Sequence, residues 1–160
     1  TSIRLIGWIV TETTITNQRP SGAQISYKVI MIATAANAYQ QTQVMTASRV
    51  QLIVLLYDSA IQSMELAREA ILTNNYKDKA RFLDRSIAIV GELSSVLDFE
   101  RGGEIAVSLH RLYDYMVQQC IQANLRHNGK HLDGPIRCLT TLREGWHVVA
   151  RQEAVAHVGS

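Results

Sequence analysis

Residues 44–85 read VMTASRVQLIVLLYDSAIQSMELAREAILTNNYKDKARFLDR, and this stretch contains neither proline nor glycine. Both residue types interrupt helices, so their absence over such a length favours long, uninterrupted α-helices. Proline is scarce in the whole chain, which has only Pro20 and Pro135. The stretch therefore predicts an all-α fold.

Apolar side chains that recur every three or four residues predict four helices. The first starts after Ser48, whose hydroxyl can cap the first turn, and ends at the Thr-Asn-Asn cluster of residues 73–75. The other three are predicted over residues 77–97, 104–124 or slightly beyond, and 132–152. Helices of about 20 residues joined by short loops pack as antiparallel neighbours, so the predicted architecture is an up-and-down four-helix bundle.

The breaks between the later helices have recognisable chemistry. The second predicted helix stops near Asp98, before the Arg-Gly-Gly break of residues 101–103. Glu104 then falls in the first turn of the third helix, where a negative side chain complements the helix dipole. Asn128 and Gly129 are predicted to end that helix, because both tolerate the left-handed conformation. Gly134 and Pro135 fall in the first turn of the fourth helix, where a missing amide costs least.

Residues 1–30 differ in character from the rest of the chain. They are rich in Thr, Ile and Val and carry a Pro-Ser-Gly turn signal at residues 20–22, which favours extended structure. We interpret them as a leader or extension, with Met31 as a plausible natural start. A short extended or helical segment (31–47), the bundle (48–153) and a C-terminal tail (154–160) follow. We hypothesise that the leader docks on apolar bundle surface and mimics a client, through Ile3, Leu5, Ile6, Trp8, Ile9 and Val10.

Charge and composition exclude several classes of protein. The net charge of +2 resides in residues 1–30, and the remainder is neutral, which argues against a nucleic-acid or membrane-surface module. No apolar run approaches the roughly 20 residues that span a bilayer, and no convincing signal peptide is present. Cys120 and Cys138 lie in apolar helical patterns, which suits buried, reduced thiols and a cytosolic location.

Motifs for catalysis and metal binding are incomplete. Glu144 and His147 form a single E-x-x-H pair, whereas a di-iron bundle needs two such pairs and two further carboxylates. His127 and His131 are separated by Gly129 in a predicted loop, so a helical two-histidine metal face is not expected. No phosphate-binding loop and no G-x-S-x-G motif occurs. The sequence therefore predicts a protein that is not an enzyme and uses no cofactor or metal.

Residues 52–56, LIVLL, carry the functional signal. Successive positions of a helix are about 100° apart, so five apolar residues in a row cover its whole circumference. Four bundled helices each keep an outward face, so we expect part of this surface to meet a partner or a covering segment. An amphipathic helix laid in a groove is the natural binding mode.

Several segments resemble the FliS family of flagellar secretion chaperones, in the right order and with compatible spacing. The resemblance covers roughly residues 38–153 and none of residues 1–30. Ser59 stands where the family commonly has glycine, and Ser108 where it commonly has asparagine. The matching segments are AYQQTQVMTAS (38–48), LLYDSAI (55–61), LDFERGGEIA (97–106), LHRLYDYM (109–116), ANLRHN (123–128) and residues 142–146.

The resemblance implies a cytosolic chaperone without ATPase activity. Such a chaperone binds the disordered C-terminal region of flagellin in hydrophobic surface grooves, prevents premature polymerisation and assists delivery to the flagellar type III export gate. It further implies that the segment with Ala38 and Tyr39 lies near the groove and can cover it. A helical adaptor for another protein partner is the alternative function. We expect a monomer or weak dimer.

The candidate flagellin-binding residues are apolar or aromatic and lie on the predicted helices or just before them. For most of them, core packing and a place in the groove are equally expected, because the sequence does not orient a helix that is apolar all round. Tyr57 and Tyr115 are expected to pack their rings while their hydroxyls reach water or a partner. The candidates are Tyr39, Val44, Leu52, Leu55, Leu56, Tyr57, Ile87, Val90, Leu109, Tyr113 and Met116.

Overall fold

The computed structural model describes residues 49–158, and within them the chain is almost entirely helical. The all-α prediction is confirmed. None of these helices combines the length and the apolar character that crossing a bilayer requires. The elements are α4 (Arg49–Leu72), α5 (Tyr76–Ser95), α6 (Phe99–Arg126), a short 3-10 helix η1 (Gly129–Leu132) and α7 (Asp133–Val158).

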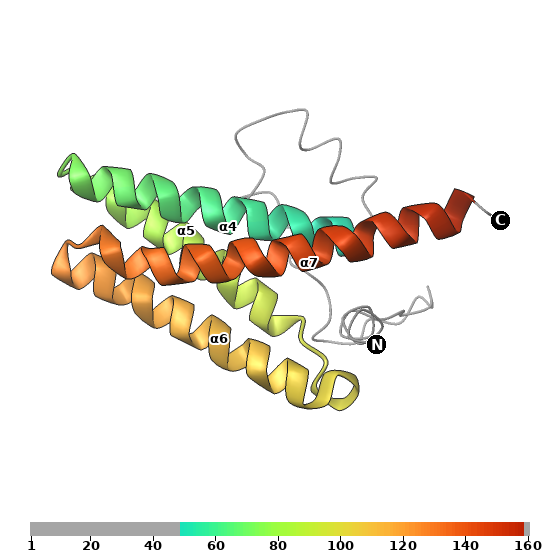
Figure 1. The fold of residues 1–160 in the computed structure, drawn as a ribbon. Helices are drawn as coiled ribbons and strands as arrows, with labels where there is room; N and C mark the ends of the chain where they lie inside the picture. Colours follow the sequence, from blue (N-terminus) through green and yellow to red (C-terminus); the bar gives the residue numbers. More distant parts are fainter. Residues whose placement is uncertain (1–48, 159–160) are drawn as a thin grey trace, which may run out of the picture.

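The helices run alternately up and down, as predicted (Figure 1). Helix α4 packs against both α5 and α7, and α5 also packs against α6. Helices α6 and α7 meet chiefly at the end where η1 joins them, and they diverge towards the other end (Figure 1). Within residues 49–158, the main neighbours of α4 are therefore α5 and α7, and it also contacts η1.

The first loop follows its predicted position. Helix α4 ends at Leu72, and Asn74 adopts a left-handed conformation with a φ of 54°. The Asn75 side chain accepts a hydrogen bond from the Asp78 amide at 3.2 Å and so caps α5. Because of this cap, α5 begins at Tyr76 and ends at Ser95, slightly earlier than the predicted range of 77–97. The predicted cap of the first helix, Ser48, lies outside the described residues.

The predicted break at residues 101–103 is a kink inside α6, not the gap before it. The Asp98 side chain accepts from the Arg101 amide at 3.0 Å, which starts the helix at Phe99. Gly103 then interrupts it with φ 49° and ψ −129°, a conformation open in practice to glycine alone. Glu104 follows this kink. The predicted start of the helix at Glu104 was therefore wrong, because the helix begins five residues earlier, at Phe99.

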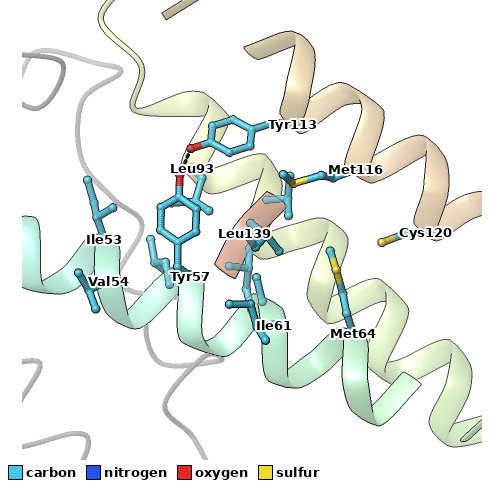
Figure 2. Close-up of a cluster of buried hydrophobic side chains, with 14 of the residues drawn as sticks. Ile53, Val54, Tyr57, Ile61, Met64, Leu93, Tyr113, Met116, Cys120 and Leu139 are labelled. Carbon is cyan, nitrogen blue, oxygen red and sulfur yellow. Dashed lines mark hydrogen bonds between the residues drawn. The ribbon is translucent and has the colours of Figure 1, made fainter. Parts of the chain in front are cut away.

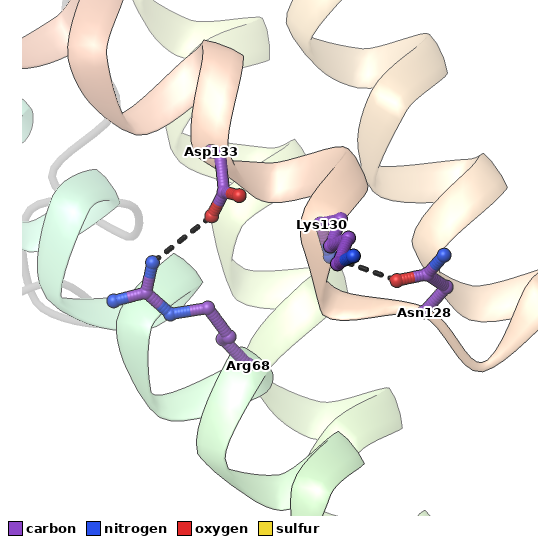
Figure 3. A network of polar contacts seen from close by, with 4 residues as sticks. All are labelled: Arg68, Asn128, Lys130 and Asp133. Atoms are coloured by element: carbon purple, nitrogen blue, oxygen red, sulfur yellow. Dashed lines mark hydrogen bonds and ion pairs between the residues drawn. The ribbon is translucent and has the colours of Figure 1, made fainter.

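The predicted left-handed end of α6 falls one residue early. His127 has a φ of 48° and caps the helix, whereas Asn128 and Gly129 were predicted to do so. Asn128 instead caps η1 by accepting from the Lys130 amide at 3.0 Å (Figure 3). A Cβ on Gly129 would lie 2.8 Å from Cγ of Arg68, so α4 packs close to this loop.

Helix α7 starts and ends differently from the predicted range of 132–152. The Arg68 guanidinium binds the Asp133 carboxylate at 3.1 Å and ties α4 to the start of α7 (Figure 3). Pro135 lies in the first turn, as predicted, and is buried. The helix continues past residue 152 to Val158 because no glycine or proline occurs between Gly145 and Gly159.

The core runs through the middle of the bundle and draws on all four long helices. Figure 2 shows part of it, including Ile53 and Met64 of α4, Met116 of α6 and Leu139 of α7. The Cys120 thiol is also enclosed, and burial raises its pKa from 9.0 to about 12. Cys138 is half-buried against the core.

Candidate functional site: the outer face of α4

The apolar run of residues 52–56 is divided between two environments. Ile53, Val54 and Leu56 are 2%, 7% and 1% exposed and point into the core. Leu52 and Leu55 stay half-buried. Among the described residues, α5, α7 and the short helix η1 pack against α4, so part of its circumference has no helix packed against it. Five successive apolar residues leave two at the boundary between core and surface.

A hollow opens between α4 and α7 beside this run. Its lining includes Leu55 and Ile61, which are apolar, and Asp58 and Glu65, which are acidic. Arg143 of α7 lies across from them and donates from Nη1 to Oδ1 of Asp58 at 2.8 Å. This ion pair joins the two helices at the hollow, which can accept both an apolar and a polar side chain.

Other members of the predicted binding set are enclosed in the bundle. Each is at most 2% exposed, so in this conformation they pack the core and offer no surface. These residues are Leu56, Tyr57, Val90, Tyr113 and Met116.

The expectation for the Tyr57 hydroxyl was wrong. It reaches neither water nor a partner, because it forms a hydrogen bond with the Tyr113 hydroxyl inside the core (Figure 2). Burial raises the pKa of Tyr57, and burial together with the neighbouring Tyr57 raises the pKa of Tyr113 further. For Tyr115, which was also expected to reach water or a partner with its hydroxyl, the side chain is accessible: the residue is 44% exposed.

The remaining members of the set are scattered. Ile87 of α5 and Leu109 of α6 are half-buried against the core and do not line the hollow. Tyr39 and Val44 lie outside the described residues. Among the predicted residues, the structure thus brings Leu52 and Leu55 together on one helix, with Leu55 at the hollow.

Two surface features were missed from sequence. Helix α6 exposes Val107, Ile121 and Leu125, whose separations of 14 and 18 residues are close to whole numbers of helical turns and put them on one side. That spacing was a usable signal. The Asp58–Arg143 pair carried none, because its members are 85 residues apart in the chain.

The histidines and the E-x-x-H pair have separate environments. Glu144 and His147 are both exposed. His127 Nδ1 lies 2.9 Å from Nζ of Lys79, whereas His131 Nδ1 lies 3.2 Å from Oε1 of Gln119. Across residues 49–158, no three potential metal ligands converge.

Comparison with known proteins gives a consistent result. The family model for flagellar protein FliS matches residues 31–153. The flagellar secretion chaperone FliS of Campylobacter jejuni is 35% identical over 122 residues, which are 76% of this chain and 95% of the relative. The flagellar secretion chaperone FliS of Salmonella typhimurium is 35% identical, over 74% of this chain and 91% of the relative. The FliS of Bacillus subtilis is 30% identical, over 77% of this chain and 91% of the relative. This chain therefore belongs to the FliS family, a family of flagellar chaperones and not of enzymes.

Proposed function

We propose that this chain is a cytosolic export chaperone for flagellin. It binds the disordered C-terminal region of flagellin in hydrophobic surface grooves, prevents premature polymerisation and assists delivery to the flagellar type III export apparatus. The observation that carries the proposal is the family match over residues 31–153, which includes all of α4, α5 and α6.

The surface of the bundle supports this proposal. Leu52 and Leu55 are only half-buried on α4, and Val107, Ile121 and Leu125 are exposed on α6. Burying a leucine or isoleucine fully contributes roughly 1.5–3 kcal/mol, whereas ordering a flexible tail costs roughly 2–5 kcal/mol or more. Several anchors on more than one helix are therefore needed, and the bundle offers them.

Within the predicted binding set, accessibility divides the roles. Leu52, Leu55, Ile87 and Leu109 are the described members with exposed surface, so they are the candidates for direct contact. The enclosed members of the set pack in the core and hold in place the helices that carry these candidates. Tyr39 is assigned to the groove by the family resemblance alone.

Calorimetric titration of the full chain with the C-terminal segment of flagellin tests the proposal. We expect saturable binding that Leu55→Ala weakens about tenfold, since a tenfold change corresponds to about 1.4 kcal/mol. Leu72→Ala is the matched control, because Leu72 is 72% exposed at the end of α4 and lies outside the set. Tyr39→Ala should weaken binding more than it lowers bundle stability. Absence of binding, with capture of a different exported protein, would favour the adaptor function.

Residues 1–30 provide a second test. If they mimic the client, a chain that starts at Met31 should bind the flagellin segment more tightly than the full chain. Equal affinities would remove the mimicry hypothesis and leave the proposed function intact.

A further inference from the structure

The charged side chains that line the hollow between α4 and α7 favour a positively charged partner. Among the described residues of its lining, Arg143 is the only cation, and its charge is already paired with Asp58 at 2.8 Å. The Nε atom of Arg143 is itself buried. Glu65 is exposed and forms no ion pair within residues 49–158. The part of the lining that the structure describes therefore has one carboxylate in excess.

The hollow also has a direction along α4. Leu55, half-buried, lies at one end, and Glu65 lies ten residues further along the helix at the other. At 1.5 Å per residue this separation is about 15 Å, or nearly three helical turns. Between them, the exposed Gln62 adds an amide that can bond to a side chain or a peptide group. Leu55 thus lies beside the neutralised Asp58–Arg143 pair, whereas the carboxylate of Glu65, at the other end of the same depression, has no ion-pair partner within residues 49–158.

We infer that this hollow receives a cationic amphipathic segment of the partner: an apolar side chain seats on Leu55, and a lysine or arginine two to three turns away pairs with Glu65. The inference rests on the proposed function, since the partner is then the flagellin segment. Charge complementarity decides the occupant, because an acidic segment would face the unpaired Glu65 carboxylate. The apolar contact supplies affinity, and the ion pair fixes the register.

Charge reversal at Glu65 tests the inference. In calorimetric titration of the full chain with the flagellin C-terminal segment, Glu65→Lys should weaken binding about tenfold, because it replaces an attraction by a repulsion. Glu69→Lys is the matched control: it makes the same change of net charge one turn further along α4, outside the hollow, and should stay within about twofold of the original chain. Both residues are exposed, so thermal melts should show an intact bundle for both variants.

A charge swap identifies the partner residue. Each lysine and arginine of the flagellin segment is changed to glutamate in turn, and one of these changes should weaken binding to the original chain and restore it to the Glu65→Lys chain. Equal affinities of the original, Glu65→Lys and Glu69→Lys chains would overturn the inference and leave the proposed function standing. A change of oligomeric state on Glu65→Lys, with peptide binding unchanged, would assign the hollow to a second copy and also overturn it.

If the flagellin segment does not bind the original chain, the proposed function fails, and two synthetic peptides then decide the inference. The peptides are amphipathic helices with the same leucines, one carrying lysines and the other glutamates on the polar edge. Preference for the lysine peptide that disappears in Glu65→Lys, but not in Glu69→Lys, supports the inference. Equal binding of the two peptides overturns it.

Discussion

The inner and outer faces of α4 differ in what their side chains do, although they share one helix. The inner face carries Ile53, Leu56 and Tyr57, which are enclosed by the other helices. The outer face carries Leu55 and Glu65, which line a hollow open to solvent. Neighbouring residues such as Leu55 and Leu56 therefore belong to different parts of the molecule, and the comparison separates stability from binding.

Truncation of the two adjacent leucines should give the largest contrast. Leu56→Ala removes a side chain that is 1% exposed and should lower the free energy of unfolding by about 2–5 kcal/mol. Leu55→Ala should lower it less, because the side chain is only half-buried and its loss leaves no closed cavity. Urea denaturation of both variants measures the difference. Equal losses would mean that the two faces are not distinct.

Removal of one hydroxyl from the buried tyrosine pair should have the next largest effect. Tyr57→Phe leaves the Tyr113 hydroxyl without its partner in the core, which costs about 1–3 kcal/mol. Tyr113→Phe should cost less, because the Tyr57 hydroxyl also bonds to the Trp146 side chain. The double variant should lose less than the sum of the single losses. Additive losses in denaturant titrations would show that the two hydroxyls act independently.

Alkaline pH should destabilise the protein through titratable groups that are buried in the core, on α6 as well as on α4. The pKa of Cys120 rises from 9.0 unfolded to about 12 folded, so the folded state holds this proton more tightly. The stabilising contribution is complete below pH 9 and is lost as the pH rises from about 9 to 12. Free energies of unfolding measured across this range should fall more steeply for the original chain than for Cys120→Ala. The buried Tyr57 and Tyr113 add a loss of the same sign above pH 10 in both proteins. Parallel profiles would contradict the assignment to Cys120.

The ion pair on the outer face should contribute least to stability. Asp58 and Arg143 retain 43% and 30% of their side-chain exposure, so Asp58→Ala should lower the free energy of unfolding by about 0.2–1 kcal/mol. Asp58→Asn should recover part of this, since its amide oxygen still accepts from Arg143. The difference from the original chain should shrink in 1 M salt. A loss comparable to that of Leu56→Ala would show that the outer face is also part of the core.

Local chemistry predicted where the helices stop, and its errors were also local. Asn75 and Asp98 cap helices near the predicted breaks, because short polar side chains satisfy free amides wherever a helix begins. His127, not Asn128, takes the left-handed position, because the Lys79 side chain meets both His127 and the Asn124 carbonyl there. Such contacts come from another helix and leave no trace in the local sequence.

The candidate site was predictable only in part. Helical geometry predicts that residues 52–56 are not all buried, and in the structure Leu52 and Leu55 are partly exposed. Which of the five remain exposed depends on where α5 and α7 pack against α4. The sequence likewise did not reveal the hollow, since Arg143 reaches Asp58 from a distant helix.

The sequence by itself determined an all-α bundle, the approximate ends of its helices and the resemblance to flagellar chaperones, because periodicity, caps and breakers act within a few residues. The tertiary structure decided which side of each helix faces inward. It enclosed Tyr57, Tyr113 and Met116, and it left Leu55 beside Glu65 and Arg143 at a hollow. A helix that is apolar all round has no preferred orientation of its own, so only the packing of its neighbours selects one.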